Sequence, residues 1–309
     1  MFKLTKTMVD TNDDNRVIHK LIFEDDNAIA ETVVYNYGTR HVICFSVQSG
    51  CHVGCTFCGT GKKFIRDLTS DEMMSQISEA LKLFNNSNSD NANLQIMSMS
   101  MGEPMDNMTN VCNVIEKLNI LAIQNKFPKH EFFLSTVGLN HVDSIQRLIS
   151  LFKFENFGLQ FSLHHFNNVS RKKLLGDYKY LLDISDLRTI ANIFKLVTGK
   201  RAYFNYIPSG DEHYYEIENL LDIVNGHHLT CSVLCNTNKL ICGNIDKVVN
   251  FTKKVGDVML SNSWIEDYDI EISTFNPMGQ DTIGGGCGQL LYVQEKLKGR
   301  DIHNGYIIR

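Results

Sequence analysis

The sequence predicts an α/β fold built on a parallel sheet, either barrel-like or doubly wound. One observation is that strand and helix patterns alternate along the chain from residue 41 onward. A second is that unusual polar residues follow the strands, at the end where barrels build their active sites. No glycine-rich dinucleotide fingerprint follows the first of these strands, which favours the barrel.

The chain is expected to begin with a short β extension. Residues 17–23 and 28–36 have the side chains typical of strands, and turn residues separate them. Residues 1–16 form a polar start. We therefore predict a β extension at residues 1–40 and a single structural unit, the barrel, at residues 41–309.

The barrel elements follow in order. Strands are expected at residues 41–48, 94–99, 131–136, 158–163, 202–207, 229–234 and 269–275. Helices are expected at residues 70–84, 107–123, 141–152, 185–197, 214–224 and 244–255. The first helix has Met73, Ile77 and Leu81 on one face, and Thr69 and Glu72 stand at the spacing of a capping box.

Candidate functional residues gather after six of these strands. They occupy residues 49–58, 102–104, 135–136, 162–164, 235–236 and 276–287. In a (β/α) barrel the carboxyl ends of the strands meet at one face, where the active site lies. Six coincidences of this kind indicate one shared site rather than six unrelated turns.

The composition is typical of an intracellular protein with reduced thiols. The chain has 309 residues, nine of them cysteine, and a formal net charge of −5. The polar N-terminus is unlike a signal peptide, and no apolar run approaches the roughly 20 residues that span a bilayer, so we expect a cytoplasmic protein. An RNA partner would need local basic clusters such as Lys62-Lys63 or Arg171-Lys172-Lys173, which are more often ordinary solvated faces.

Cys51, Cys55 and Cys58 form a C-x3-C-x2-C run in the loop after the first barrel strand. Thiolates are soft ligands that suit iron–sulfur clusters, and three of them leave one iron of a [4Fe-4S] cluster open. A zinc site is the alternative, and it would need a fourth ligand. Candidates for that ligand are Cys231, Cys235 and Cys242. These three could instead be buried thiols, which is the commoner fate of such cysteines, and the barrel position of the run favours the cluster.

The cysteine run, placed at a barrel strand end, resembles the signature of the radical S-adenosylmethionine (SAM) superfamily. Met101-Gly102-Glu103-Pro104 is similar to the superfamily's motif for the SAM amino group. The resemblance implies a partial (β/α)6-type radical SAM barrel with two cofactors, a [4Fe-4S] cluster and SAM. In that superfamily SAM binds the open iron and is split into methionine and a 5′-deoxyadenosyl radical.

Further motifs resemble the RlmN/Cfr family of radical SAM RNA adenine methyltransferases. Cys287 lies in Gly286-Cys287-Gly288-Gln289-Leu290, which matches the family's CGQL element. Cys44 stands seven residues before Cys51, and Glu31 stands thirteen residues before Cys44, as in that family. The similarity covers residues 23–297, and the family's usual N-terminal accessory domain is not expected here.

The same resemblance implies the SAM contacts. The family supplies them from its LST and SLH elements, its Gly-Glu-Pro motif and an asparagine. The implied contacts are Gly102, Glu103, Ser135, Ser162, Leu163, His164 and Asn236. Asn236 is the least direct of these, because the family's IP-x-N segment matches poorly here and Asn238 is an alternative.

The family's chemistry implies a role for each reactive residue. Cys287 as a thiolate takes a methyl group from one SAM, and the radical from a second SAM removes a hydrogen from it. The methylene radical then adds to an adenine carbon, and Glu31 accepts the ring proton. Cys44 releases the product by forming a disulfide with Cys287. The implied product is adenine methylated at C2, with C8 less expected, in ribosomal or transfer RNA.

Two other functions stay open from the sequence. A radical SAM enzyme of the same fold could be an activase or modify a peptide or small molecule, although such an enzyme needs neither Cys44 nor Cys287. A zinc-stapled RNA-binding module would have no catalytic role. The leading function implies a monomer whose partners are structured RNA and an electron donor such as flavodoxin or ferredoxin.

Overall fold

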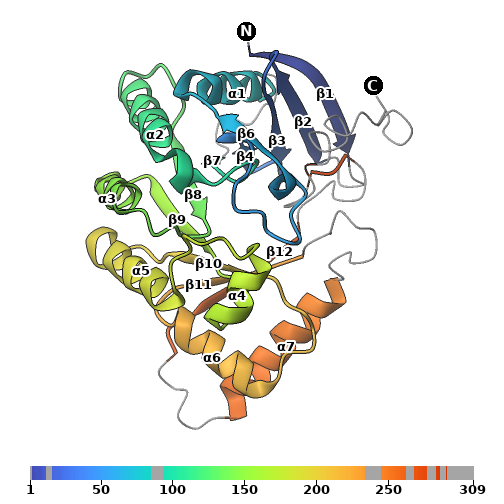
Figure 1. Cartoon of the computed structure of the whole chain (residues 1–309), viewed down its shortest axis with the longest axis vertical. Helices are drawn as coiled ribbons and strands as arrows, with labels where there is room; N and C mark the ends of the chain where they lie inside the picture. Colours follow the sequence, from blue (N-terminus) through green and yellow to red (C-terminus); the bar gives the residue numbers. More distant parts are fainter. Residues whose placement is uncertain are drawn as a thin grey trace.

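One long sheet organises the molecule. A computed structural model describes the chain at residues 2–11, 16–84, 93–233, 245–261, 268–276, 283–285 and 290. The sheet has ten strands in the order β1-β2-β3-β4-β7-β8-β9-β10-β11-β12 (Figure 1). Its edge strands β1 and β12 do not pair with each other in the described residues, so the barrel is open, as the sequence predicts.

The N-terminal strands are antiparallel. They are β1 (Lys3–Thr11), β2 (Val17–Glu24) and β3 (Ile29–Asn36), and β3 pairs antiparallel with β4 (Arg40–Cys44). The two predicted stretches of the extension are confirmed as β2 and β3. The prediction missed β1, because it is an edge strand whose side chains are mostly exposed and polar, without the apolar alternation of a half-buried strand.

The strands from β4 to β12 of this sheet pair in parallel. After β4 these are β7 (Asn93–Met97), β8 (His130–Thr136), β9 (Phe157–Ser162), β10 (Tyr203–Tyr206), β11 (His228–Ser232) and β12 (Glu271–Phe275). They confirm the strands predicted for the barrel. The first of them is shorter than predicted, since β4 ends at Cys44 and the chain then turns toward a separate hairpin.

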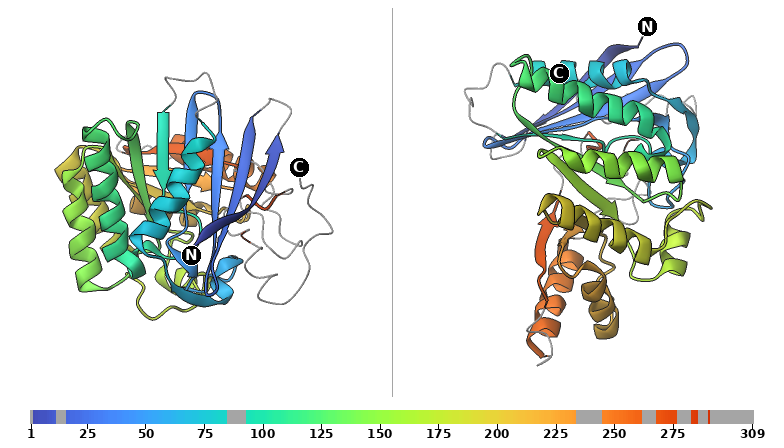
Figure 2. Two further views of the ribbon diagram at one scale, coloured as in Figure 1. Left: turned by 90° about the horizontal axis from the view of Figure 1, so that it is seen from above. Right: turned by 90° about the vertical axis from the view of Figure 1, so that its left-hand side faces the viewer.

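Helices follow the strands along one side of the sheet (Figure 2). Those predicted are α1 (Ser70–Lys82), α2 (Met108–Ile123), α3 (Val142–Ser150), α5 (Ile184–Thr198), α6 (Tyr214–Val224) and α7 (Ile245–Ser261). Single 3-10 turns lie at Thr60–Lys62, Pro104–Asn107 and Leu151–Lys153. The helix α4 (Asn168–Leu174) was not predicted, because its one buried side chain is an arginine. Among the helices of the described part, none has the length and apolarity to cross a membrane.

The predicted start of α1 is confirmed in atomic detail. The hydroxyl of Thr69 accepts a hydrogen bond from the amide of Glu72, and the Glu72 carboxylate accepts one from the amide of Thr69 at 2.8 Å. This reciprocal cap satisfies two backbone donors that the first turn leaves without helical partners. The helix then buries Met73 and Ile77 against the sheet.

The two faces of the sheet have different surroundings. Alternate residues such as Phe132 and Leu134 of β8 are fully buried in the core shared with the helices. The intervening Phe133 lines a cavity of about 280 Å³, whose wall is made by strands from β3 round to β12. The inner face of the sheet therefore encloses a space, which is where a barrel enzyme binds its substrates.

Candidate active site

The cysteine run lies in a loop between two short strands, β5 (Gln48–Gly50) and β6 (Phe64–Asp67), which pair antiparallel. Gly50 turns the chain into the loop with a φ of +87°, and a Cβ atom there would lie 1.9 Å from the carbonyl oxygen of Lys63. The amide of Cys51 donates to that same oxygen at 3.1 Å. The β5–β6 hairpin thus closes the base of the loop.

The helix α4 holds the other side of the cysteine loop. The amide and the hydroxyl of Thr56 both donate to the carbonyl oxygen of Leu174, at 2.9 and 3.1 Å. Gly176 approaches so closely that a Cβ atom there would lie 2.4 Å from the carbonyl oxygen of Gly54. The loop is therefore fixed between the hairpin and α4 by contacts to its main chain.

The side chains of Cys51, Cys55 and Cys58 are partly buried. Burial raises the pKa of Cys51 and of Cys55 well above its ordinary value, and the neighbouring Cys58 thiol raises both further. Thiolates here need positive charge from a bound metal centre. In the described residues no three His, Cys, Asp or Glu side chains converge on one ion, whereas a cubane cluster takes each thiolate on a different iron. This donor set fits a [4Fe-4S] cluster.

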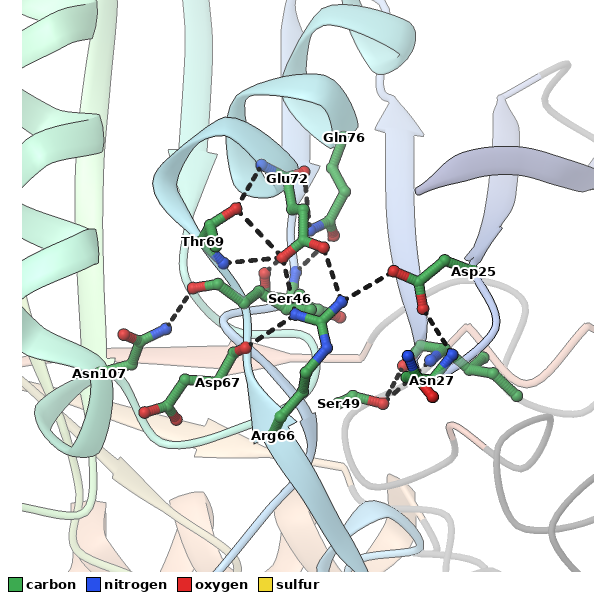
Figure 3. Close-up of polar contacts among 12 residues, drawn as sticks. Asp25, Asn27, Ser46, Ser49, Arg66, Asp67, Thr69, Glu72, Gln76 and Asn107 are labelled. Atoms are coloured by element: carbon green, nitrogen blue, oxygen red, sulfur yellow. Dashed lines mark hydrogen bonds and ion pairs between the residues drawn. The ribbon is translucent and has the colours of Figure 1, made fainter. Parts of the chain in front are cut away.

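A polar network anchors the chain behind the loop (Figure 3). Gln76 of α1 accepts a hydrogen bond from the amide of Ser46 at 2.9 Å and donates one to its carbonyl oxygen at 3.0 Å. The side-chain amide of Asn107 donates to the carbonyl oxygens of Val47, at 2.8 Å, and Leu68, at 2.7 Å. These two side chains thus give hydrogen-bond partners to backbone groups of Ser46, Val47 and Leu68, and Gln76 ties the chain after β4 to α1.

Arg66 of β6 ties the outside of the hairpin to its neighbours (Figure 3). It forms ion pairs with Glu72 at 2.6 Å and with Asp25 at 3.0 Å. Burial opposes ionisation of Glu72, but hydrogen bonds from Arg66 and Thr69 lower its pKa below the ordinary value. The pKa of Asp25 is also lowered, because the Asn27 amide and Arg66 outweigh the effect of burial.

Gly102 and Glu103 follow β7. Gly102 has a φ of +97°, and a Cβ atom there would lie 2.5 Å from the Cβ of Gln48, so only glycine fits. Glu103 is buried, and its carboxylate accepts hydrogen bonds from the hydroxyl of Thr136 and from the amide of Val137 at 3.0 Å. Burial raises the pKa of Glu103 to about 7. Glu103 has no ion-pair partner among the described residues, so this carboxylate can receive a cationic ligand group.

The segment Ser162–His164 leaves β9 beside the cysteine loop. The amides of Leu163 and His164 donate to the carbonyl oxygen of Asn205 at 2.9 and 3.1 Å. His164 has a φ of +57°, and its ring meets the Phe57 ring edge-on at 5.1 Å. Burial and the nearby Arg171 lower the pKa of His164 to about 3, so the ring is neutral. Its buried Nδ1 has no hydrogen-bond partner in the described part of the chain, which leaves it available to a ligand.

The sheet brings most of the predicted SAM contacts to one end of the barrel. Residues 102–103, Ser135 and residues 162–164 lie at or after the carboxyl ends of β7, β8 and β9, which are adjacent parallel strands. Ser135 is half-buried at the end of β8. Asn236 and the alternative Asn238 lie outside the described residues.

Glu31 and Cys44 lie on the inner face of β3 and β4. Cys44 pairs with Val33, two residues along β3 from Glu31, so the side chains of Glu31 and Cys44 point to the same face. The carboxylate of Glu31 forms an ion pair of 2.5 Å with the ammonium group of Lys20 of β2, and both side chains are buried. Cys44 is half-buried in the wall of the cavity.

Cys287 itself lies outside the described residues, but residues on both sides of it are described. The ammonium group of Lys20 donates to the first two carbonyl oxygens of segment 283–285, at 3.3 and 3.4 Å. The hydroxyl of Tyr35 donates to the third at 2.5 Å. Leu290 packs in the same apolar cluster as Tyr35, beside Cys44. The described residues flanking Cys287 thus lie against the face that carries Glu31 and Cys44.

Sequence reasoning missed two buried cations at this site. Lys20 stands within an apolar strand, and that position was the only available signal. Arg171 was interpreted with Lys172 and Lys173 as a solvated basic cluster, and this is wrong for Arg171, which is only 2% exposed. Lys172 and Lys173 are exposed as expected, because they lie on the other side of α4.

Known proteins resemble this chain over most of its length, although no protein-family model matches it. Two are named "Probable dual-specificity RNA methyltransferase RlmN". The protein from Clostridium novyi (strain NT) is 32% identical over 277 residues, and that from Clostridium perfringens (strain 13 / Type A) is 31% identical over 279 residues. The matches cover 88% and 89% of this chain and 75% of each relative.

Solved structures share the fold. A radical SAM methyltransferase from Sphaerobacter thermophilus superposes with a TM-score of 0.74 at 24% identity, over 93% of this chain and 80% of its own. SuiB of Streptococcus suis bound to S-adenosylmethionine superposes with a TM-score of 0.52 at 14% identity, over 78% of this chain and 53% of its own. These likenesses confirm the predicted barrel class.

Proposed function

Because the chain belongs to the RlmN family of radical SAM dual-specificity RNA methyltransferases, we propose that it methylates an adenine ring carbon in RNA, C2 rather than C8, through an S-methylcysteine. The observation that carries this proposal is the arrangement of residues on the inner face of β2, β3 and β4. There the Lys20–Glu31 ion pair and the Cys44 thiol lie beside the segment that leads to Cys287. An activase or a peptide-modifying radical enzyme has no use for that arrangement.

The substrate class follows from the relatives. Their name, dual-specificity RNA methyltransferase, supports structured RNA as substrate, and we propose ribosomal RNA, transfer RNA or both. We further propose that the enzyme is monomeric and cytoplasmic. Its N-terminal extension would comprise residues 1–40, whose strands continue the barrel sheet, and its barrel would comprise residues 41–309. A one-electron carrier such as flavodoxin or ferredoxin would serve as electron donor.

Two groups of residues would hold the cofactors. Cys51, Cys55 and Cys58 would bind a [4Fe-4S] cluster. The SAM contacts would be Gly102, Glu103, Ser135, Ser162, Leu163, His164 and Asn236. When bound, the cluster would supply the electron that splits SAM and creates the radical. The Glu103 carboxylate would accept hydrogen bonds from the SAM ammonium group, and the unpartnered Nδ1 of His164 would meet a polar group of the ligand.

The reactive residues of the chain would then act in order. The Cys287 thiolate takes a methyl group, and after hydrogen removal its sulfur carries the methylene carbon that bonds to adenine. Glu31, which is ion-paired with Lys20, would accept the ring proton, and the one electron that the adduct gives up would pass to the cluster held by the cysteine run. The Cys44 thiolate attacks the sulfur of Cys287. The sulfur–carbon bond breaks, its electron pair stays on carbon, and that carbon takes up a proton to become the methyl group.

The direct test is mass spectrometry of nucleosides from cells with and without the protein. We expect 2-methyladenosine in ribosomal or transfer RNA only when the protein is present, and none with the Cys287→Ala variant. 8-Methyladenosine in its place would reassign the methylated position. The absence of both nucleosides, with soluble protein present, would contradict the proposed function.

A further inference from the structure

Arg171 of α4 is a buried cation without a carboxylate partner among the described residues. It is 2% exposed. Its guanidinium donates to the main-chain carbonyl oxygens of Leu182, at 2.9 Å, and Val137, and lies 3.5 Å from that of Ser162. These carbonyls satisfy hydrogen bonds and fix the plane of the group, but they carry no full negative charge to balance it.

A buried charge of this kind is costly unless an opposite charge lies near. Burial lowers the pKa of Arg171 to about 10, so the group stays protonated at neutral pH. The acidic side chains whose negative charge would raise its pKa are, in decreasing order of effect, those of Cys55, Asp183 and Glu103. The first of these belongs to the cysteine run, and none forms an ion pair with Arg171 in the described residues.

The helix that carries Arg171 lies directly on the cysteine loop. Its C-terminal residue Leu174 accepts both hydrogen bonds from Thr56, which follows Cys55. Gly176, just beyond the helix, approaches the Gly54 carbonyl too closely for any side chain. The cation therefore has a fixed position relative to the loop, set by contacts that do not depend on its own charge.

We propose that Arg171 is the counter-charge of the iron–sulfur cluster and raises its reduction potential. The inference rests on the proposed cluster at Cys51, Cys55 and Cys58. The negative charge of three thiolates exceeds the positive charge of an oxidised iron–sulfide core by one unit. Reduction by one electron from the external donor raises this net negative charge to two units, because no proton is taken up. A fixed cation stabilises the reduced form more than the oxidised form, and the low dielectric of the interior strengthens this effect. Arg171 is thus a positioning residue that acts on the cluster through charge.

The test compares variants that separate charge from packing. Arg171→Met removes the charge at similar length, Arg171→Gln also keeps hydrogen-bond donors, and Arg171→Lys keeps the charge. Arg201→Met is the matched control, because Arg201 is partly exposed and already paired with Asp269 and Glu271. For each protein, iron and sulfide per chain are measured first. The midpoint potential is then determined by EPR-monitored redox titration, with and without SAM.

We expect Arg171→Met and Arg171→Gln to make reduction about tenfold less favourable, a fall of about 59 mV in midpoint potential. Arg171→Lys and Arg201→Met should stay close to the unmodified protein. A loaded Met or Gln variant with an unchanged potential overturns the inference. A shift seen only with SAM also overturns it, since Arg171 would then act on SAM.

Cluster loading separates the remaining outcomes. If Met and Gln both fail to assemble a cluster while Lys assembles one at the normal potential, the counter-charge role is supported. If Lys fails as well, Arg171 has a packing role and the inference is wrong. Unmodified protein that binds no iron would instead contradict the proposed function, independently of Arg171.

Discussion

The two sides of the active site differ in how their buried charged side chains are balanced. On the inner face of β2 and β3, Lys20 and Glu31 neutralise each other at 2.5 Å, and both are almost fully buried. At the cysteine loop, Glu103 and Arg171 are buried as deeply, yet neither has an ion-pair partner among the described residues. The first side is complete in the protein alone. The second side has charges that suit a cationic and an anionic ligand.

This difference has a physical basis in what each side must do. In the proposed mechanism Glu31 accepts one proton, and the adjacent Lys20 ammonium group balances the charge of its buried carboxylate before the substrate arrives. A cofactor site gains affinity when its buried groups are matched only in the bound state. Substitutions should therefore affect the stability of the free protein on the first side, and ligand binding or potential on the second.

The largest effect is expected for Lys20→Met. Removing the ammonium group leaves the Glu31 carboxylate buried without its partner, and it also frees the carbonyl oxygens of Ile283 and Gly284. Breaking a buried pair in this way costs about 3–5 kcal/mol of unfolding free energy. Urea unfolding followed by circular dichroism measures it. RNA methylation should be lost, because Lys20 no longer holds the Glu31 carboxylate and the segment that leads to Cys287 in place.

The double variant Lys20→Met with Glu31→Gln is the control for that prediction. It removes both charges, so most of the lost stability should return while RNA methylation stays absent. A Lys20→Met protein as stable as the unmodified chain would show that the pair is not structurally coupled, and the contrast between the two sides would fail.

An intermediate effect is expected for Glu103→Gln on SAM binding. Losing a charge-assisted hydrogen bond should weaken SAM roughly tenfold or more, measured by isothermal titration calorimetry on cluster-loaded protein. The buried carboxyl has a pKa of about 7, and the SAM ammonium group favours its ionised form. SAM affinity of the unmodified protein should therefore fall as the pH drops below this value. The SAM affinity of the Gln variant should not depend on pH in this range. If the variant and the unmodified protein had the same pH profile, Glu103 would not be the group that binds the SAM ammonium.

The smallest effect is expected for Arg66→Met, outside both sides. Its ion pairs with Asp25 and Glu72 are partly exposed, so their loss should cost about 0.5–1 kcal/mol at pH 7. Both carboxyls have pKa values lowered by folding, so this contribution is present above their unfolded values and is lost as the pH falls through the folded ones. Thermal melts of the variant and the unmodified protein should therefore approach each other progressively as the pH falls below about 4. A difference that grows on acidification would contradict the assignment.

Much of the fold could be predicted because the barrel repeats a strong local pattern. Buried parallel strands and one-sided helices differ in period, and this contrast located the parallel strands β4 and β7–β12 and every described α-helix except α4. The strands β5 and β6 were missed because they have only three and four residues, too few for a periodic pattern. Two other missed elements, β1 and α4, bury too few apolar side chains to leave a periodic signal. Their structure depends on partners elsewhere, namely β2 for the first and the cysteine loop for the second.

The site residues show the same distinction between those that local sequence reveals and those that depend on the folded structure. The cysteine run, Glu103 and His164 could be proposed as site residues because they belong to compact motifs. Lys20 could not, because it binds a carbonyl oxygen 263 residues away in the chain, and only the folded sheet brings the two together. Arg171 resembles its neighbours Lys172 and Lys173 in sequence, and only the direction in which it leaves α4 separates it from them.

The central claim is that Cys44 resolves a covalent adduct between Cys287 and RNA. The most direct measurement is intact-mass analysis of Cys44→Ala protein after purification with its RNA and nuclease digestion, with the Cys44→Ala, Cys287→Ala double variant as control. We predict a nucleotide-sized mass addition on the single variant and none on the double variant. A soluble, cluster-loaded Cys44→Ala protein that methylates Cys287 but never carries RNA would contradict the account.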